Sequence, residues 1–212
     1  AFLGCVQGLG LAAAAMNLAI TGAHSMGKST LVQDWVRAHP NTLLEDEPYR
    51  VLGLHGPYEI QFRDAATRHH NGLMLYYNIG RCYRHSQREQ PVIFDRCPID
   101  FIAYSQFAAD CGRSDIDDAF VDSMLEPTRE CLACLDLLVF IPKTDEAPVH
   151  LEDDGIRPID HAYRDAMDLI FKQIYRDGRY GLIHSPQFPP VLELWGSREE
   201  RLQKLEQAIA SL

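Results

Sequence analysis

The sequence predicts an α/β fold in which helices cover both faces of a parallel sheet. Short apolar runs alternate along the chain with longer segments of helical periodicity, which is the order typical of βαβ units. Residues 137–141 are uniformly apolar, as strands buried on both faces are. A glycine-rich turn joins the first apolar run to the first helical segment.

The first elements alternate strand and helix. Residues 18–21 are a short apolar run that ends at Gly22, so we expect a strand. Residues 28–38 contain no Pro or Gly and carry apolar side chains at helical spacing. Residues 42–45 are the second candidate strand, and the helical pattern returns over residues 64–88.

The middle of the chain repeats this pattern. Residues 92–94 form a third candidate strand, which ends in Asp95 and Arg96. Pro98 suits the first turn of a helix that runs toward Ala109.

A fourth strand follows a further helix. Residues 117–135 are expected to be helical, with Pro127 as a point where the helix can break or kink. Residues 137–141 are the strand described above. Residues 143–158 are polar, acidic and contain prolines, so we expect a mobile connection.

The last elements complete the alternation. Residues 160–176 are expected to be a helix, and residues 191–194 a strand. Ser197 is a candidate N-cap of a final helix, because Glu200 follows at the spacing of a capping box.

Length and charge limit the classes of function. A chain of 212 residues suits one α/β domain, here expected over residues 16–212. Asp and Glu number 30 against 20 Lys and Arg, so the net charge is −10. This charge argues against broad binding to nucleic acid or to an anionic membrane surface. No segment is long and apolar enough to cross a membrane, so a cytoplasmic location is expected; the oligomeric state, homo-oligomer included, stays open.

The first fifteen residues differ from the rest. They are apolar and uncharged, and they lack the positive region of a signal peptide. We expect an added leader or a disordered extension, with Met16 as the native start. The six cysteines are scattered, and the pair Cys131 and Cys134 has no obvious second pair of ligands for zinc. Reduced thiols are therefore expected.

Residues 22–29, Gly-Ala-His-Ser-Met-Gly-Lys-Ser, fit the pattern G-x-x-x-x-G-K-[ST] of a phosphate-binding loop. Its glycines let backbone N–H groups point at phosphate oxygens, and the following helix adds its positive N-terminus. We expect Lys28 to reach the β- and γ-phosphates and the Ser29 hydroxyl to bind Mg²⁺. The residues expected to hold the nucleotide are Gly22, Ala23, His24, Ser25, Met26, Gly27, Lys28, Ser29 and Thr30. His24 occupies a variable position and receives no chemical role.

Asp95 and Arg96 follow the third strand. A loop of this kind requires a carboxylate at the end of another strand to hold Mg²⁺, directly or through water, and Asp95 supplies it. Arg96 places a cation where the acceptor or the transferred phosphoryl group lies. This pair favours a kinase over a simple NTPase.

Glu47 and Arg50 follow the second strand, at the edge where open α/β sheets bind ligands. Glu47 is expected to accept a proton from a substrate hydroxyl or to bind a sugar, with Glu45 as the alternative if the strand register differs by two. Arg50 lies close enough to share one helical turn with Glu47. An ordinary solvated ion pair is the other interpretation.

A lid is expected over about residues 143–164. Kinases exclude water during transfer, and three cations lie in or beside this segment: Lys143, Arg157 and Arg164. Gly155 is a candidate hinge, and Arg157 is expected to move onto the phosphates when the lid closes.

These motifs together resemble a known family. In order they are GAHSMGKST, EPYR, FDRCPIDFIAY, LLVFIP, DDGIRPIDHAYRDAMDLI and VLELWGSREERL. From Met16 to the C-terminus the chain resembles the NadR-like P-loop ATPase/kinase proteins, which are related to nicotinamide riboside kinases and nucleoside kinases. It departs from the family pattern at Met26 and at Pro48-Tyr49, which leaves the acceptor open.

The resemblance implies a P-loop NTPase three-layer sandwich, with five parallel strands in the order 2-3-1-4-5. It also implies that Asp95 serves Mg²⁺ or the acceptor hydroxyl, that Glu47 and Arg50 lie on the substrate side, and that Arg157 belongs to the lid. Two further residues, Gly196 and Ser197, are implied to lie near the adenine of ATP.

The leading hypothesis is a kinase that transfers the γ-phosphoryl group of MgATP to a hydroxyl of a nucleoside-like small molecule. In this hypothesis Lys28 and Mg²⁺ stabilise charge, Asp95 or Glu47 serves the hydroxyl, and Arg96 with Arg157 neutralises the transferred group. A regulatory ATPase that acts as a nucleotide-dependent switch is the alternative. A kinase acting on a polynucleotide end is a third, which the acidic charge disfavours. ATP is preferred over GTP because the Asn/Thr-Lys-x-Asp element is absent from the sequence.

Overall fold

The fold is a five-stranded parallel sheet between two layers of helices. A computed structural model describes residues 15–87, 89–147 and 160–212. The strand order is β2-β3-β1-β4-β5, and each neighbouring pair is parallel, as predicted. The strands are β1 (Asn17–Thr21), β2 (Leu43–Glu45), β3 (Val92–Asp95), β4 (Leu137–Phe140) and β5 (Val191–Glu193).

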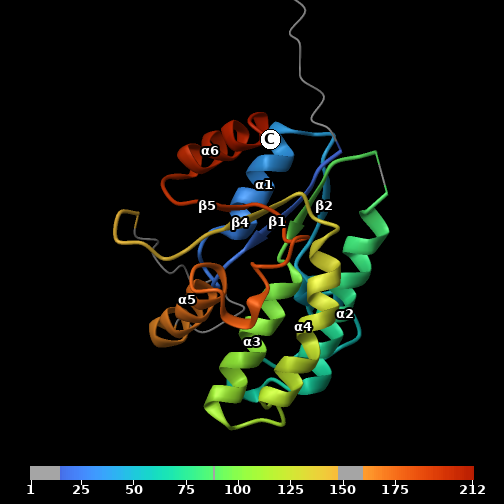
Figure 1. The fold of residues 1–212 in the computed structure, drawn as a ribbon, viewed down its shortest axis with the longest axis vertical. Helices are drawn as coiled ribbons and strands as arrows, with labels where there is room; N and C mark the ends of the chain where they lie inside the picture. The colour runs from blue at the N-terminus through green and yellow to red at the C-terminus, as the bar shows by residue number, and fades with distance from the viewer. Residues whose placement is uncertain (1–14, 88, 148–159) are drawn as a thin grey trace, which may run out of the picture.

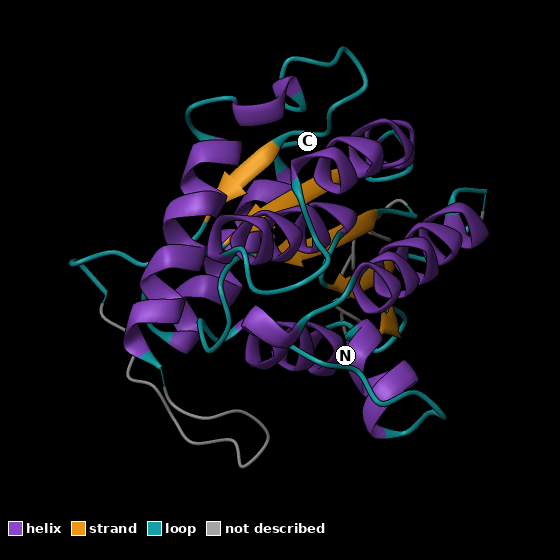
Figure 2. Ribbon diagram, turned by 90° about the horizontal axis from the view of Figure 1, so that it is seen from below, coloured by secondary structure: helices purple, strands orange, loops and turns teal. Residues whose placement is uncertain are grey.

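Helices lie on both sides of the sheet (Figure 1). On one side α1 (Lys28–Ala38) packs against α6 (Arg198–Ala210) and against the strands. The other side carries α2 (Arg68–His85), α3 (Pro98–Cys111), α4 (Asp118–Leu132) and α5 (His161–Tyr175), with α3 contacting the other three. Seen from below, the strands lie among the surrounding helices (Figure 2).

The three central strands form the core of the sheet. All residues of β1, β3 and β4 are buried, which explains why their sequences are nearly continuous apolar runs. The register aligns Ile20 with Asp95 on one side and with Val139 on the other. The carboxyl ends of β1 and β3 are therefore level, and Asp95 lies beside the start of the loop that follows β1.

The helix expected over residues 64–88 is shorter than predicted. It begins at Arg68 because Thr67 caps it: the Thr67 hydroxyl accepts a hydrogen bond from the His70 amide at 3.2 Å. A 3₁₀ turn, η2 (Arg63–Ala65), precedes the cap. Helix α4 continues through Pro127, so of the two predicted effects, a break or a kink, the break does not occur.

A π-helix, η1 (Arg50–Leu54), was not predicted from the sequence. It follows β2 and is closed by a hydrogen bond from the His55 amide to the Arg50 carbonyl at 2.9 Å. Such turns are rare and are frequent at functional sites, and this one carries Arg50 toward the carboxyl edge of the sheet.

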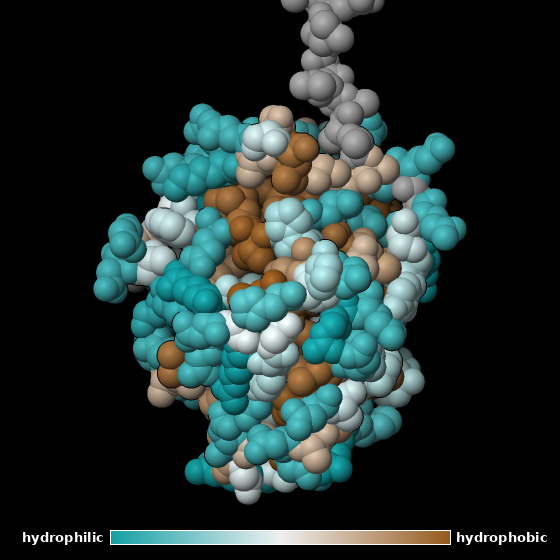
Figure 3. Space-filling view, viewed as in Figure 1, coloured by the Kyte–Doolittle hydropathy of each residue, from teal (hydrophilic) through white to brown (hydrophobic). Residues whose placement is uncertain are grey.

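The described part of the chain has no helix with the length and apolar character that a membrane span requires. On the face seen in Figure 3, hydrophilic residues dominate the outline, and hydrophobic side chains gather in the recesses near the centre. Residues 1–14, which contain most of the expected leader, lie outside the described residues.

Candidate functional site

The predicted phosphate loop connects β1 to α1 and wraps tightly. Its backbone takes positive φ angles at Gly22 (134°), Ser25 (54°) and Gly27 (78°). A Cβ atom on Gly22 would lie 2.6 Å from the carbonyl oxygen of Ile141, so only glycine fits there. This geometry is what a loop needs to turn successive amides toward one anion.

Lys28 is the first residue of α1 and is buried, with its ammonium donating a hydrogen bond to the Ala23 carbonyl inside the loop. Burial, and to a smaller extent the nearby Arg96, lowers the pKa of Lys28 to about 7. A phosphate group beside the amine would favour the protonated form and raise this pKa again. The amine is therefore suited to respond to a bound anion.

Ser29 and Asp95, the two residues predicted to serve Mg²⁺, are in direct contact at the sheet edge. The Ser29 hydroxyl donates to Asp95 Oδ2 at 2.6 Å. The other carboxylate oxygen, Oδ1, is buried and has no hydrogen-bond partner in the described ranges. Burial, together with the charge of Glu47, raises the pKa of Asp95. A buried oxygen without a donor beside a hydroxyl fits Mg²⁺, which prefers oxygen ligands.

Arg50 reaches the same two side chains. Its Nη2 donates to Ser29 Oγ at 3.0 Å, and its Nη1 donates to Asp95 Oδ2 at 3.3 Å. Asp46 Oδ1 accepts from Nη1 at 2.8 Å. The prediction placed Arg50 beside Glu47; their charged groups are 3.9 Å apart, so Arg50 contacts the predicted metal ligands more closely than it contacts Glu47.

Arg96 is buried in a network of carboxylates. Its Nε donates to Glu47 Oε1 at 2.7 Å, and its Nη1 donates to Asp100 Oδ1 at 2.8 Å. Nη1 also lies 3.4 Å from the Gly22 carbonyl, at the start of the phosphate loop. Burial opposes the charge of Arg96, but Tyr104, Glu47 and Asp100 outweigh it and raise its pKa well above the ordinary value. Arg96 therefore stays charged between the loop and Glu47.

Glu47, not Glu45, faces a cavity. Glu45 Oε1 lies 2.5 Å from His85 Nε2, and Glu45 Oε2 accepts from Arg81 Nη1 at 3.3 Å, so its carboxylate is held by α2. Glu47 lines the cavity together with Arg96. The structure thus turns Glu47 toward the cavity and holds Glu45 on α2.

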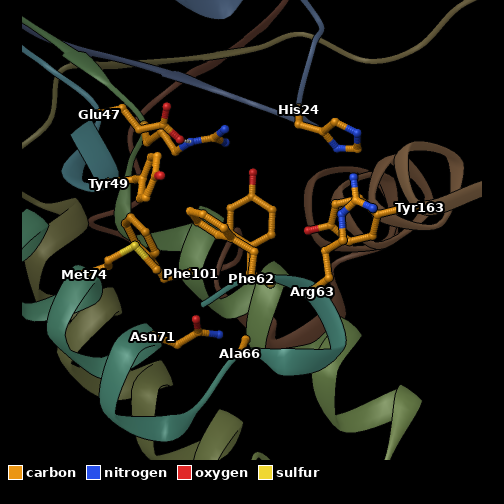
Figure 4. A pocket seen from close by; sticks show the side chains of 12 residues that line it. His24, Glu47, Tyr49, Phe62, Arg63, Ala66, Asn71, Met74, Phe101 and Tyr163 are labelled. Carbon is orange, nitrogen blue, oxygen red and sulfur yellow. Dashed lines mark hydrogen bonds and ion pairs between the residues drawn. The ribbon is translucent and has the colours of Figure 1, made fainter. Parts of the chain in front are cut away.

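The cavity has a volume of about 170 Å³ and is mainly aromatic (Figure 4). It is lined by His24, Glu47, Tyr49, Phe62, Arg63, Ala66, Asn71, Met74, Arg96, Phe101, Tyr104 and Tyr163. Ring faces suit a flat apolar group, while the polar side chains can fix its orientation. One lining residue, His24, belongs to the phosphate loop itself, so the loop and the cavity share a wall.

The two predicted lid cations that the structure describes, Lys143 and Arg164, do not line this cavity. Lys143 follows β4, and its Nζ lies 2.6 Å from Asp165 Oδ1. It borders a second, polar hollow of about 490 Å³ with Asp168 and Trp195. Arg164 is buried in the first turn of α5, and its Nε is 3.9 Å from Asp165 Oδ1. Arg157 lies outside the described residues.

Gly196 and Ser197 lie at the start of α6. The Ser197 hydroxyl caps the helix in the predicted capping box with Glu200. Arg201 links this turn to the phosphate loop: its Nε donates to the Gly196 carbonyl at 2.9 Å, and its Nη1 donates to the Met26 carbonyl at 2.7 Å. The structure therefore brings Gly196 beside the loop.

Sequence reasoning missed several residues of the site. Arg201 gave no local signal, because its two acceptors are backbone carbonyls. Asp100 had one: it lies four residues after Arg96, at the start of a helix opened by Pro98, which places the two side chains together. The aromatic lining had none, because its residues come from segments far apart in the sequence.

Comparison with known proteins agrees with this architecture. A family model described as an AAA domain matches residues 17–201. A crystal structure of NadR protein in complex with NR has a TM-score of 0.66 at 17% identity, with 93% of this chain and 52% of that chain covered. A crystal structure of NadR protein in complex with NAD and AMP-PNP has a TM-score of 0.61 at 16% identity, with 93% of this chain and 50% of that chain covered.

A third structure is covered along its whole length. Deoxyadenosine kinase from M. mycoides, with products dCMP and a flexible dCDP bound, has a TM-score of 0.62 at 13% identity, covering 93% of this chain and 100% of that one. This chain spans about half the length of the NadR chains. No curated protein sequence matches it. The likeness establishes the fold of P-loop kinases and agrees with a phosphotransferase or an ATPase.

Proposed function

Because the chain belongs to the AAA domain family, we propose that it binds MgATP and phosphorylates a hydroxyl of a nucleoside-like small molecule. Nicotinamide riboside is one example of such an acceptor. The observation that carries the proposal is the wall shared by the phosphate loop and the aromatic cavity, formed by His24. Nucleoside-type ligands in the NadR and deoxyadenosine kinase structures support this class of acceptor.

On the donor side, residues 22–30 hold the phosphates with backbone amides, and Lys28 supplies a positive charge from the start of α1. Gly196 and Ser197 lie beside the loop, where the adenine is proposed to bind. Ser29 and Asp95 would hold Mg²⁺, which would supply positive charge to neutralise the phosphates. Asp95 Oδ1, which has no hydrogen-bond partner among the described residues, supports this assignment.

On the acceptor side, Glu47 is the proposed base. Glu47 lines the cavity, whereas Asp95 accepts a hydrogen bond from the Ser29 hydroxyl at the proposed metal site. The acceptor hydroxyl gives its proton to Glu47 as its oxygen forms the new bond to the γ-phosphorus. The bond from that phosphorus to the bridging oxygen breaks, and ADP leaves with the electron pair.

Arg96 is proposed to stabilise the negative charge that develops during transfer. Its guanidinium is held between the loop carbonyl of Gly22 and the carboxylate of Glu47, which places a fixed cation between donor and acceptor. Lys143, Arg157 and Arg164 stay proposed lid residues that complete the exclusion of water.

A nucleoside panel tests the proposal. Purified protein is incubated with γ-labelled MgATP and each nucleoside, and labelled nucleoside monophosphate is measured. We expect label to enter at least one nucleoside and to disappear in Lys28→Ala. Release of labelled phosphate at a rate that no nucleoside changes would contradict the kinase and favour the regulatory ATPase.

A further inference from the structure

Arg50 contacts both side chains to which a magnesium role is proposed. We propose that Arg50 is a positioning residue that competes with Mg²⁺ for Ser29 and Asp95, and thereby couples binding of the metal–nucleotide complex to the acceptor cavity. This inference rests on the proposed function. The inference adds to the proposed function an internal cation, Arg50, that the metal must displace.

Charge beside Ser29 defines the competition. The proton of Ser29 is directed to Asp95 Oδ2 at 2.6 Å, and Arg50 Nη2 uses one of the two lone pairs at 3.0 Å, which leaves the second lone pair open. A metal bound to the Ser29 oxygen would place a double positive charge beside the guanidinium. This repulsion favours metal binding only when Arg50 moves away.

Arg50 is charged and held by further carboxylates. An arginine guanidinium keeps its charge in proteins. The Nη1 that donates to Asp95 also donates to Asp46 Oδ1, at 2.8 Å, which anchors the guanidinium. Arg50 is thus a permanent competitor for the metal ligands at any pH in which the protein is studied.

The position of Arg50 on η1 connects this competition to the cavity. Tyr49 immediately precedes Arg50 and lines the cavity, as does Glu47, whose carboxylate lies 3.9 Å from Arg50 Nη2. Displacement of Arg50 removes one cation from Glu47, which lines the cavity. Because coupling between two sites is reciprocal, acceptor binding then changes the affinity for the metal by the same factor.

Metal titration of the ADP complex tests the inference without measuring turnover. Mn²⁺ replaces Mg²⁺, and uncomplexed Mn²⁺ is followed by electron paramagnetic resonance in the presence of ADP. The variants are Arg50→Gln, which keeps hydrogen-bonding capacity without the charge, and Arg50→Lys, which keeps the charge. Arg37→Gln is the matched control, because Arg37 is exposed on α1 and pairs with Asp34.

We expect Arg50→Gln to bind Mn²⁺ about tenfold more tightly than wild type, the equivalent of one charge-assisted hydrogen bond. The affinity of Arg50→Lys for Mn²⁺ should lie between those of Arg50→Gln and wild type. The affinity of Arg37→Gln should match that of wild type. Equal or weaker metal binding by Arg50→Gln, with normal ADP binding, overturns this inference alone. Wild-type protein that binds no ADP overturns the proposed function and this inference with it.

Discussion

The imidazole of His24 stacks on the ring of Tyr163, with ring centres 4.7 Å apart and planes inclined by 25°. His24 belongs to the phosphate loop and Tyr163 to the first turn of α5, and both line the aromatic cavity. A side chain at a variable position of the loop motif is therefore part of the cavity wall. The stack joins the proposed donor side of the site to the proposed acceptor side.

Replacing His24 with alanine should weaken acceptor binding more than ATP binding. The stack contributes about 1 kcal/mol, so the KM for the nucleoside should rise about fivefold while the KM for ATP changes little. The measurement is steady-state kinetics with each substrate varied. Tyr163→Ala and the double variant complete a cycle; purely additive effects would show that the two rings do not act together.

Replacing Glu47 with glutamine should stop transfer without preventing nucleotide binding. The amide keeps the shape of the side chain but cannot take the hydroxyl proton, so kcat should fall about a hundredfold or more. Single-turnover transfer and calorimetric titration with ADP separate the two steps. Glu45→Gln is the matched control: its carboxylate is held by Arg81 and His85, so it should lower stability and leave the chemical step intact.

Nucleotide binding should take up protons above neutral pH. The pKa of Lys28 is about 7 because of burial and Arg96, and bound phosphates raise it. Above pH 7 the amine is mostly neutral in the unliganded protein and must be protonated on binding, so affinity should fall as pH rises. At pH 8, calorimetry in buffers of different ionisation enthalpy should detect up to about one proton per ADP. Proton uptake that persists in Lys28→Met would contradict this assignment.

The same lowered pKa predicts how stability depends on pH. The unfolded chain keeps the ordinary lysine pKa of 10.5, so it binds more protons than the folded protein between about pH 7 and that value. This contribution therefore makes the folded state more stable as pH rises through that window.

Replacing Asp100 with asparagine should destabilise the protein. Asp100 is fully buried and pairs with Arg96, so its removal leaves a buried guanidinium with one carboxylate fewer, at a cost of about 3 kcal/mol. Urea denaturation measures the change. Asp122→Asn on the exposed side of α4 is the control and should change stability by less than about 0.5 kcal/mol. A loss for Asp100→Asn no larger than this would contradict the proposed network.

The sequence alone determined the local elements with strong signals. Helix α1 was predicted at its observed bounds, and the capping box of Ser197 and Glu200 was predicted with them, because each depends on residues within a few positions. The strand order came from family resemblance. The π-helix η1 was missed, because its wide turn is stabilised by contacts of Arg50 with Ser29 and Asp95 that local periodicity does not report.

Tertiary structure decided which charged groups meet. The pairing of Arg96 with Glu47 spans 49 positions, and that of Ser29 with Asp95 spans 66. The sequence indicated the loop and the strand ends as places of chemistry, because parallel strands end at one edge. It did not assign partners among the carboxylates and arginines there, since every such pair is chemically compatible. Only packing selects between Glu45 and Glu47, by pairing Glu45 with Arg81 and His85 of α2 and turning Glu47 into the cavity.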